Sequence, residues 1–431
     1  MQLLASLLKD YLAFEGMLRT AQIIRRFSFT EWGGTETVVW NTARGLPALE
    51  VQCDILATSA CAKPGMEERE GVRIQRFPYI YPWWPMSAWR KETLDKKGGN
   101  PYSPGLRRLL QGEEYELLHI HNSGRLAELT RMVSRQRKIP YCISFHGGFL
   151  DIPPEETQKM MEVFRGTLSW GGLTDRLLRR KADTVASADG IICVGANELA
   201  HLQELYPDKP VLYLPNGVET ERFRTKVDFD WRAHLRLSRQ CKLYLCVSRI
   251  DYQKNQILLL RMMRRCRDLG EDSHLLLIGP ETVAWYGDKL RKFLRQENLQ
   301  ERVTIFPGLP PDDERLTAAY QQADLFLLPS LHEPFGIVAL EAWSAGLPVI
   351  ASAVGGLKHL IKDQHNGMLF QSDDLNSLME ARARLDQPEL RAELVVNASK
   401  EVETSYTWPV ICKRLADFYQ LVRERFVPSG D

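Results

Sequence analysis

The chain has 431 residues, which is too long for one ordinary hydrophobic core and suits about two domains. Hydrophobic residues make up 44% and charged residues 26%, as in soluble globular proteins, and the net charge of +1 argues against a broad nucleic-acid-binding surface. Eight cysteines without a C-x-x-C pair, the lack of a basic leader, and no apolar run near the roughly 18 residues that span a bilayer predict a cytoplasmic protein.

The first predicted strand is followed by two adjacent glycines. The strand covers Ala21–Phe29, the glycines are Gly33 and Gly34, and a helix begins at about Glu36. Adjacent glycines before a helix allow a ligand to approach the backbone closely. The pattern is not G-x-G-x-x-G, which disfavours an NAD-dependent dehydrogenase. Two further strands are predicted at Val51–Ala57 and Val72–Phe77.

An unusual run, Tyr79–Gly105, is rich in prolines and aromatic residues and has no clear period. We predict a long loop or irregular excursion, and its tryptophans argue against disorder. Trp83, Trp84 and Trp89 offer flat apolar faces that could stack on sugar rings, but Trp83 and Trp84 could equally cover the core. The basic residues of the run suit an anionic group or a shallow membrane contact.

Histidines stand at the ends of the next two predicted strands. Leu117–His121 carries His119 and His121 on one strand face, and His146 directly follows the strand Tyr141–Phe145. The H-x-H pair has no third ligand at a suitable spacing, so we expect no metal site there. His146 lies at the carboxyl end of its strand, where α/β sheets place ligands.

The second half of the chain repeats the strand, loop and helix order. Pro215–Val218 is a turn signal, and a new strand, Leu243–Val247, precedes Arg249 and Lys254. Two cations at the end of a strand and the start of a helix are well placed to bind a diphosphate.

The most informative stretch is a predicted strand, loop, helix and strand between Asp324 and Ser352. This order makes a parallel βαβ unit, whose ligand side is the loop after the first strand. Glu333 lies in that loop and Glu341 lies near the start of the helix, so both can face the same crevice. Glu341 needs a hydrogen-bond donor, either a local side chain or the hydroxyls of a ribose or sugar.

Glu333 and Glu341 form an E-x7-E motif, flanked by Pro334-Phe335-Gly336 and followed by Ala345–Val349. This stretch resembles the donor-site signature of the family 4 glycosyltransferases, which are retaining enzymes of the GT-B fold. The resemblance implies an α/β protein with two Rossmann-like domains, whose parallel sheets face a central cleft. It covers the chain from about Gln22 to Phe426, strongly in the second half and through motifs in the first.

The resemblance also implies the division of labour between the domains. The P-N-G-V turn resembles the hinge of the family, so we place the acceptor-binding domain at residues 1–217 and the nucleotide-sugar-binding domain at 218–409. In this fold the last helix crosses back to the first domain. We therefore assign residues 410–431 to that domain.

The donor-site roles follow from the family motif. Glu333 would meet the donor sugar and Glu341 the ribose, while Arg249 and Lys254 would bind the diphosphate. Ser248 replaces the usual glycine of the family, which makes a backbone contact at that position doubtful. The backbone N–H groups that would face the sugar and diphosphate are those around Phe335, Gly336 and Ile337.

The remaining roles come from weaker motifs. His146 would lie near the reacting sugar, or else be a structural histidine with its hydrogen bonds satisfied. The loop with Gly33 and Gly34 would face the diphosphate and acceptor. The turn Phe306–Leu309 would carry the nucleobase through backbone groups. His146, Arg249, Lys254 and Glu333 are thus the expected catalytic residues.

The expected reaction is retaining transfer of a sugar from a nucleotide-diphosphate sugar to a glycan, lipid-linked or small-molecule acceptor, in polysaccharide or glycoconjugate biosynthesis. No metal or other cofactor is expected, and the basic residues allow contact with the inner membrane surface. The alternatives are a non-catalytic nucleotide-sugar-binding protein and a GT-B epimerase or phosphorylase. The sequence does not identify the sugar, the base, the acceptor or the oligomeric state.

Overall fold

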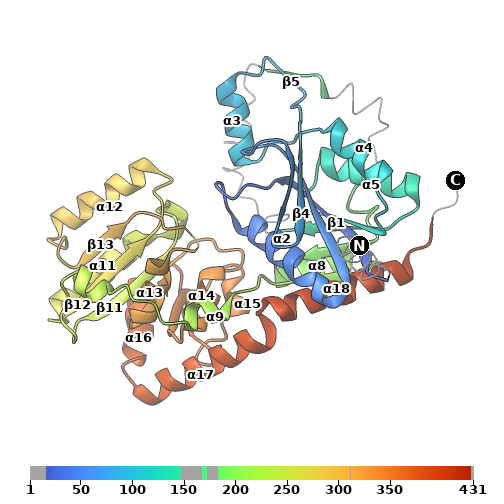
Figure 1. Ribbon diagram of the computed structural model, residues 1–431. Helices are drawn as coiled ribbons and strands as arrows, with labels where there is room; N and C mark the ends of the chain where they lie inside the picture. Colours follow the sequence, from blue (N-terminus) through green and yellow to red (C-terminus); the bar gives the residue numbers. More distant parts are fainter. Residues whose placement is uncertain (1–15, 147–166, 172–182, 311, 429–431) are drawn as a thin grey trace, which may run out of the picture. The chain divides into compact units, whose positions relative to one another are not determined.

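The computed structural model describes residues 16–146, 167–171, 183–310 and 312–428 (Figure 1). It divides the chain into two compact units, residues 1–215 with 411–431 and residues 216–410. The boundaries expected after residues 217 and 409 lie within two residues of these divisions. The sequence also contains a basic cluster, Arg176, Arg179, Arg180 and Lys181, which could meet an anionic acceptor but lies outside the described residues.

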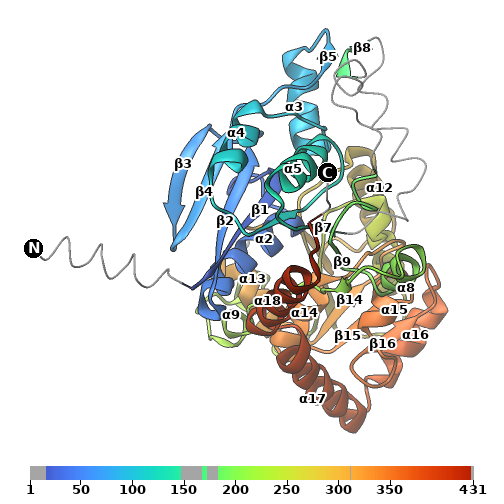
Figure 2. The same cartoon turned by 90° about the vertical axis from the view of Figure 1, so that its right-hand side faces the viewer.

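The first unit is built on an eight-stranded sheet with the order β10-β9-β7-β6-β1-β2-β4-β3. The strands are parallel except at one edge, where β3 pairs antiparallel with β4 (Figure 2). The strands are β1 (Leu18–Arg26), β2 (Val51–Thr58), β3 (Gly65–Arg69), β4 (Val72–Phe77), β6 (Leu117–Ile120), β7 (Tyr141–Phe145), β9 (Gly190–Cys193) and β10 (Val211–Tyr213).

The helices of this unit connect the parallel strands. Among the described residues they are α2 (Gly34–Gly45), the 3₁₀ turn η1 (Leu46–Leu49), α3 (Ala88–Lys97), α4 (Pro104–Gly112), α5 (Arg125–Arg137) and α8 (Ala196–Leu205). The last helix, α18 (Trp408–Arg425), begins in the second unit and belongs to the first from Ile411 onward. It packs closely there, because a Cβ atom at Gly45 would lie 2.4 Å from the Sγ atom of Cys412.

The second unit contains a six-stranded, fully parallel sheet with the order β13-β12-β11-β14-β15-β16. Its strands are β11 (Lys242–Val247), β12 (Ser273–Ile278), β13 (Val303–Phe306), β14 (Leu325–Leu328), β15 (Val349–Ser352) and β16 (Met368–Phe370). Its helices are α9 (Thr220–Arg224), α10 (Trp231–His234), η2 (Tyr252–Lys254), α11 (Gln256–Asp268), α12 (Ala284–Gln296), α13 (Glu314–Gln322), α14 (Ile337–Ser344), α15 (Leu357–Leu360), α16 (Leu375–Arg384) and α17 (Pro388–Ser405).

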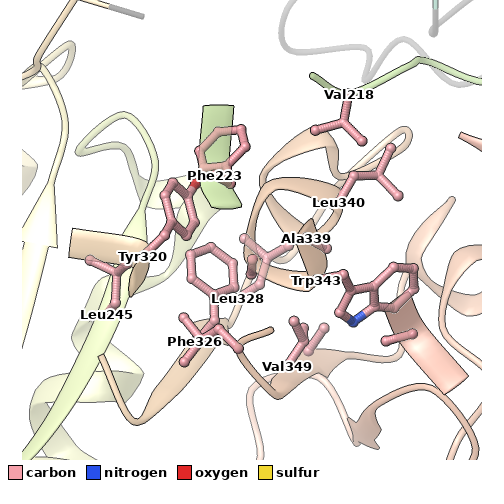
Figure 3. Packing of buried hydrophobic residues seen from close by; sticks show 14 of the residues in the cluster. Val218, Phe223, Leu245, Tyr320, Phe326, Leu328, Ala339, Leu340, Trp343 and Val349 are labelled. Atoms are coloured by element: carbon pink, nitrogen blue, oxygen red, sulfur yellow. The ribbon is translucent and has the colours of Figure 1, made fainter. Parts of the chain in front are cut away.

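The strands of this sheet are mostly apolar, since helices cover both faces, and polar residues such as Ser273, Thr304 and Ser352 are few. In β11, Leu243 and Leu245 point into one buried cluster, whereas Tyr244 and Cys246 point into the other. Figure 3 shows the first cluster, in which side chains of α14 pack on β14 and β15. This packing holds the start of α14 at the carboxyl end of β14.

The prediction of a long irregular excursion at Tyr79–Gly105 is partly wrong. The segment contains a short strand, β5 (Trp83–Trp84), all of α3 and the start of α4. The side chain of Ser87 caps α3 by accepting a hydrogen bond from the backbone N–H of Arg90 at 3.3 Å. Leu94 is the apolar residue that α3 buries, so no amphipathic period marks this helix in the sequence.

Candidate functional site

Two loops meet at the carboxyl ends of neighbouring strands in the second unit. β11 pairs with β14, and the backbone N–H of Leu331, after β14, donates to the carbonyl of Gln253, after β11, at 2.7 Å. Lys254 Nζ lies 2.7 Å from Glu333 Oε2, and both side chains are largely buried, at 15% and 13% exposure. The structure therefore brings together the ammonium and the carboxylate that the sequence assigned to the diphosphate and the sugar.

The loop after β11 is held by side-chain contacts. Gln256 Nε2 donates to Ser248 Oγ at 2.9 Å and to the carbonyl of Arg249 at 2.7 Å. Ser248, which stands where the family has glycine, thus uses its hydroxyl within the loop. The Arg249 side chain is exposed and pairs with no described residue, so its guanidinium is available to an anion.

Two glycines after β15 pack on the loop that carries Glu333. A Cβ atom at Gly355 would lie 2.4 Å from the carbonyl oxygen of Glu333, and one at Gly356 would lie 2.0 Å from that of Pro334. The N–H of Gly356 donates to the Glu333 carbonyl at 2.9 Å. Sequence reasoning assigned no role to this Gly-Gly pair, although adjacent glycines shortly after a strand were a visible signal.

The start of α14 lies in the same loop. Gly336 precedes the helix with φ of +97°, a conformation that favours glycine, and no side chain caps the helix there. The first backbone N–H groups of a helix have no partner within it, and together with the helix dipole they favour an anion. Phe335 is buried and Ile337 is half-buried, so the predicted backbone donors lie on an anchored segment.

Glu341 has a donor that the sequence did not reveal. The hydroxyl of Tyr320, on α13, donates to Glu341 Oε2 at 2.6 Å. Burial raises the pKa of the Glu341 carboxyl, while the hydrogen bond from Tyr320 and the charge of Arg222 oppose that rise. Glu341 therefore has a local partner, one of the two alternatives that the sequence left open.

Phe306 ends β13 at the same edge of the sheet. Its ring meets Trp231 edge-on at 5.1 Å between centroids, and the guanidinium of Arg315 lies 5.7 Å from its centroid. A Cβ atom at Gly308 would lie 2.7 Å from Pro280 Cδ, so the turn after β13 packs on the loop after β12. These contacts hold the Phe306–Leu309 turn in place on the second unit.

In the first unit, the predicted glycine pair lies at the start of α2. Gly33 is the residue before the helix and Gly34 is its first residue. The carboxylate of Glu36 pairs with Arg26 at 3.0 Å, and both side chains are mostly buried. A Cβ atom at Gly33 would lie 3.0 Å from Glu36 Oε2, so a larger residue there would crowd this ion pair.

His146 joins the two histidines of the H-x-H strand. A hydrogen bond of 2.8 Å links His121 Nδ1 and His146 Nε2, and the rings of His119 and His121 lie 4.0 Å apart. Burial lowers the pKa of His146 to about 4 and that of His119 to about 3, so both are neutral at pH 7. The sequence showed no third histidine near the pair, but folding provides one. Across the described ranges, no group of three His, Cys, Asp or Glu side chains could hold a metal ion.

Two tryptophans of the Tyr79–Gly105 segment are exposed on the surface of the first unit. Trp84 and Trp89 are 68% and 65% exposed, so the interpretation that Trp84 covers the core is wrong. Trp83 is half-buried. β5 pairs antiparallel with β8 (Leu168–Ser169), which brings exposed Leu168 opposite Trp84. We call Trp84, Trp89, Leu168 and Trp170 the aromatic tip.

A hollow of about 350 Å³ lies between α3 and the loop after β1. Basic and acidic side chains both line it, and sequence reasoning did not find it because its walls come from distant segments. Its lining residues are Thr30, Glu31, Cys61, Ala88, Lys91, Glu92, Asp95 and Lys96. In the part of the chain that the structure describes, no helix is both long and apolar enough to cross a bilayer.

Two sequence families match this chain. The model of "Glycosyl transferases group 1" matches residues 228–401, and that of "Glycosyltransferase Family 4" matches residues 32–222. A D-inositol 3-phosphate glycosyltransferase from Nocardia farcinica is 29% identical over 84% of this chain and 80% of its own length.

Solved structures show the same fold. Sucrose-phosphate synthase from Thermosynechococcus elongatus superposes with a TM-score of 0.68 at 22% identity, covering 94% of this chain and 99% of that one. Anabaena HepE, solved in complex with UDP, has a TM-score of 0.68 at 16% identity and covers 94% of this chain and 100% of that one. The chain therefore belongs to the family 4 glycosyltransferases and has the GT-B fold.

Proposed function

We propose that this glycosyltransferase is a retaining, metal-independent enzyme that transfers a sugar from a nucleotide-diphosphate sugar to an acceptor hydroxyl. The observation that carries the proposal is the meeting of Lys254 and Glu333 at the carboxyl ends of β11 and β14. Exposed Arg249 and the uncapped start of α14 add positive potential to the same edge of the sheet.

The chemistry asks the protein to stabilise a leaving diphosphate. As the bond from the anomeric carbon to the diphosphate breaks, negative charge grows on the diphosphate, and Arg249, Lys254 and the first N–H groups of α14 are fixed donors for it. The acceptor oxygen forms the new bond on the same face of the sugar, and its proton passes to a diphosphate oxygen. This transfer requires neither a nucleophilic side chain nor a metal ion.

We assign the parts of the donor to three places along this edge. Glu333 contacts the sugar, Glu341 the ribose, and the Phe306–Leu309 turn the base. Carboxylates accept hydrogen bonds from sugar hydroxyls, and the supported turn after β13 offers backbone groups to a base. His146 and the Gly33–Gly34 loop serve the reacting sugar and the acceptor from the first unit.

The acceptor is proposed to be a hydroxylated molecule that carries phosphate, either free or lipid-linked. The name of the Nocardia relative specifies an inositol phosphate. Lys91 and Lys96 line the hollow beside α3, together with Glu31, Glu92 and Asp95. Trp84 and Trp89 are exposed on the same segment as Arg90 and these two lysines. Aromatic and basic side chains together suit contact with an anionic membrane surface.

Product analysis with radiolabelled donor tests the proposal. UDP-, GDP- and ADP-sugars are first compared by thermal shift, because a ligand at about 100 times its dissociation constant stabilises a protein by about 2.7 kcal/mol. The best donor is then incubated with inositol phosphate and with lipid-phosphate acceptors. We expect a glycoside of unchanged anomeric configuration by NMR, and the same rate after treatment with EDTA. An inverted product, a rate abolished by EDTA and restored by a divalent cation, donor epimerisation, or binding without turnover would each contradict the proposal.

A further inference from the structure

Tyr320 is a fully buried residue of α13 whose hydroxyl reaches Glu341. The O–H group donates to Glu341 Oε2 at 2.6 Å, and the tyrosine has no exposed surface. Glu341 is half-buried at the second turn of α14, and none of the described residues donates to its other oxygen, Oε1. One carboxylate oxygen is thus held by the protein and the other remains for a ligand.

The position of the Tyr320 ring is determined by the core around it. The ring lies 5.3 Å from that of Phe223, edge to face, and 5.5 Å from that of Phe326 (Figure 3). These neighbours come from α9 and β14, so three elements locate the hydroxyl. A buried aromatic ring held on several sides has little freedom, so it can direct its hydrogen-bond partner.

A second group supports the carboxylate from α9. Arg222 Nε donates to Thr317 Oγ1 at 3.3 Å, and its guanidinium lies 5.0 Å from the centroid of Phe223. Arg222 Nη2 is buried without a hydrogen-bond partner among the described residues. The positive charge of Arg222 and the hydroxyl of Tyr320 both favour the ionised form of Glu341.

We infer that Tyr320 is a positioning residue for the nucleotide, because its hydroxyl holds Glu341 Oε2 so that Oε1 accepts hydrogen bonds from the ribose hydroxyls. The inference rests on the proposed function, in which Glu341 binds the ribose. Tyr320 itself does not touch the donor. Its effect should therefore be confined to ligands that carry ribose hydroxyls, unlike the effect of a residue that only maintains the fold.

The test compares UDP, GDP and ADP with their 2′,3′-dideoxy forms by titration calorimetry on the full chain. The pair that binds the wild-type protein best is then measured with Tyr320→Phe, Glu341→Gln and the double variant. We expect each single variant to reduce the preference for the ribose form by about tenfold, as for loss of a hydrogen bond to a charged group. The double variant should lose no more than Glu341→Gln, and affinity for the dideoxy form should not change.

Two further variants keep the result interpretable. Tyr244→Phe removes a comparable 2.7 Å hydrogen bond, from a buried tyrosine to Glu271, on the other face of the same sheet, and should leave the ribose preference intact. Glu341→Asp keeps the charge but shortens the side chain, so it should lose the preference even if Tyr320→Phe fails to fold. Two results would overturn the inference about Tyr320 while leaving the proposed function standing. One is that Tyr320→Phe or Glu341→Asp keeps the full preference for the ribose form. The other is that Tyr320→Phe loses affinity equally for the ribose and dideoxy forms. A wild-type protein that does not distinguish ribose from dideoxyribose would overturn the proposed role of Glu341 as well.

Discussion

At the scale of single residues, the pairing of Lys254 with Glu333 defines the electrostatics of the donor site. The two charges lie 2.7 Å apart with little exposure, so each compensates the cost of burying the other. Removal of one partner leaves an uncompensated charge, whereas removal of both leaves none. Single substitutions at this pair therefore report on desolvation as well as on ligand contacts.

The first prediction concerns positive charge at the diphosphate. Lys254→Ala and Arg249→Ala should each lower kcat by about 10²–10³, or roughly 2.7–4 kcal/mol, because each removes a preorganised donor. Donor affinity should fall too, since the ground state already carries the charge. Arg261→Ala, which removes an exposed cation of α11, is the matched control and should leave kcat and KM unchanged. Turnover near the wild-type rate in both variants would remove these residues from the mechanism.

The second prediction separates the two glutamates. Glu341→Gln should weaken binding of the bare nucleoside diphosphate and of the sugar donor alike, by about 1.5–3 kcal/mol, because both carry the ribose. Glu333→Gln should impair only the sugar donor. Because Glu333 also holds Lys254, we expect the effects of Glu333→Gln and Lys254→Met on donor affinity to be non-additive in a double-mutant cycle. Calorimetric titration measures each affinity, and equal losses for both ligands in both glutamate variants would show that the roles are not divided.

At the scale of elements, α3 and the β5–β8 pair place apolar side chains in water. α3 buries Leu94 but leaves Trp89 exposed, and the short β5 strand exposes Trp84. Single exposed apolar residues are common, whereas a contiguous apolar patch marks a contact with a ligand, a partner or a membrane. We therefore propose that the aromatic tip serves recognition more than folding.

The third prediction tests this surface. Trp84→Ala and Trp89→Ala should each reduce transfer to acceptor severalfold while leaving slow donor hydrolysis, nucleotide affinity and thermal stability unchanged, because both rings are mostly in water. Trp83→Ala should reduce transfer as well, with some loss of stability since that ring is half-buried. Met66→Ala, at an exposed position of β3, is the control. Loss of nucleotide binding together with stability in all three tryptophan variants would make the tip structural.

Sedimentation with anionic liposomes distinguishes a membrane contact from an acceptor contact. If the tip meets a membrane, wild-type protein should sediment at low salt, less at high salt because charge attraction is screened, and less after Trp89→Ala. Equal sedimentation by wild-type protein and Trp89→Ala would separate the tip from any membrane contact.

At the scale of the whole molecule, the last helix connects distant parts of the chain. Tyr419 of α18 shares a 2.6 Å hydrogen bond with His119 of β6, 300 residues earlier, and His119 also contacts Ser144 Oγ at 2.6 Å. His119 is buried and neutral, so the first unit depends on a polar contact that protonation would disturb.

The fourth prediction follows from the depressed histidine pKa values. His119 titrates near 6.5 when unfolded but at about 3 when folded, so the unfolded chain binds more protons between these values. Its contribution to stability is complete above pH 6.5 and is lost as the pH falls toward 3. In urea denaturation at pH 7.5, 6.5, 5.5 and 4.5, His119→Gln should reduce the acid dependence of the unfolding free energy by about 1.4 kcal/mol per pH unit below 6.5. His201→Gln, on the exposed surface of α8, should leave that dependence unchanged, and an unaltered slope in His119→Gln would contradict the prediction.

Local patterns in the sequence were sufficient for the fold and for the loops of the site. Short apolar runs separated by helical segments predict parallel sheets, because most residues of a strand buried on both faces are apolar. The spacing of Glu333 and Glu341, with the flanking glycine and proline, locates the donor loop because all of these residues belong to one βαβ unit. Helix α3 was not predicted because a helix that buries so few apolar side chains has no amphipathic period in its sequence.

The partners of the site residues were decided only by the tertiary structure. Lys254 and Glu333 are 79 residues apart, and Tyr320 and Glu341 are 21 residues apart, in separate elements. Nothing in the local sequence around Tyr320 distinguishes it from an ordinary core tyrosine. A hydrogen bond or ion pair between distant residues depends on how the helices pack on the sheet, and that packing is set by the summed burial of many apolar side chains. The chemistry of the site is therefore encoded locally, whereas the positioning of its charges is encoded by the whole core.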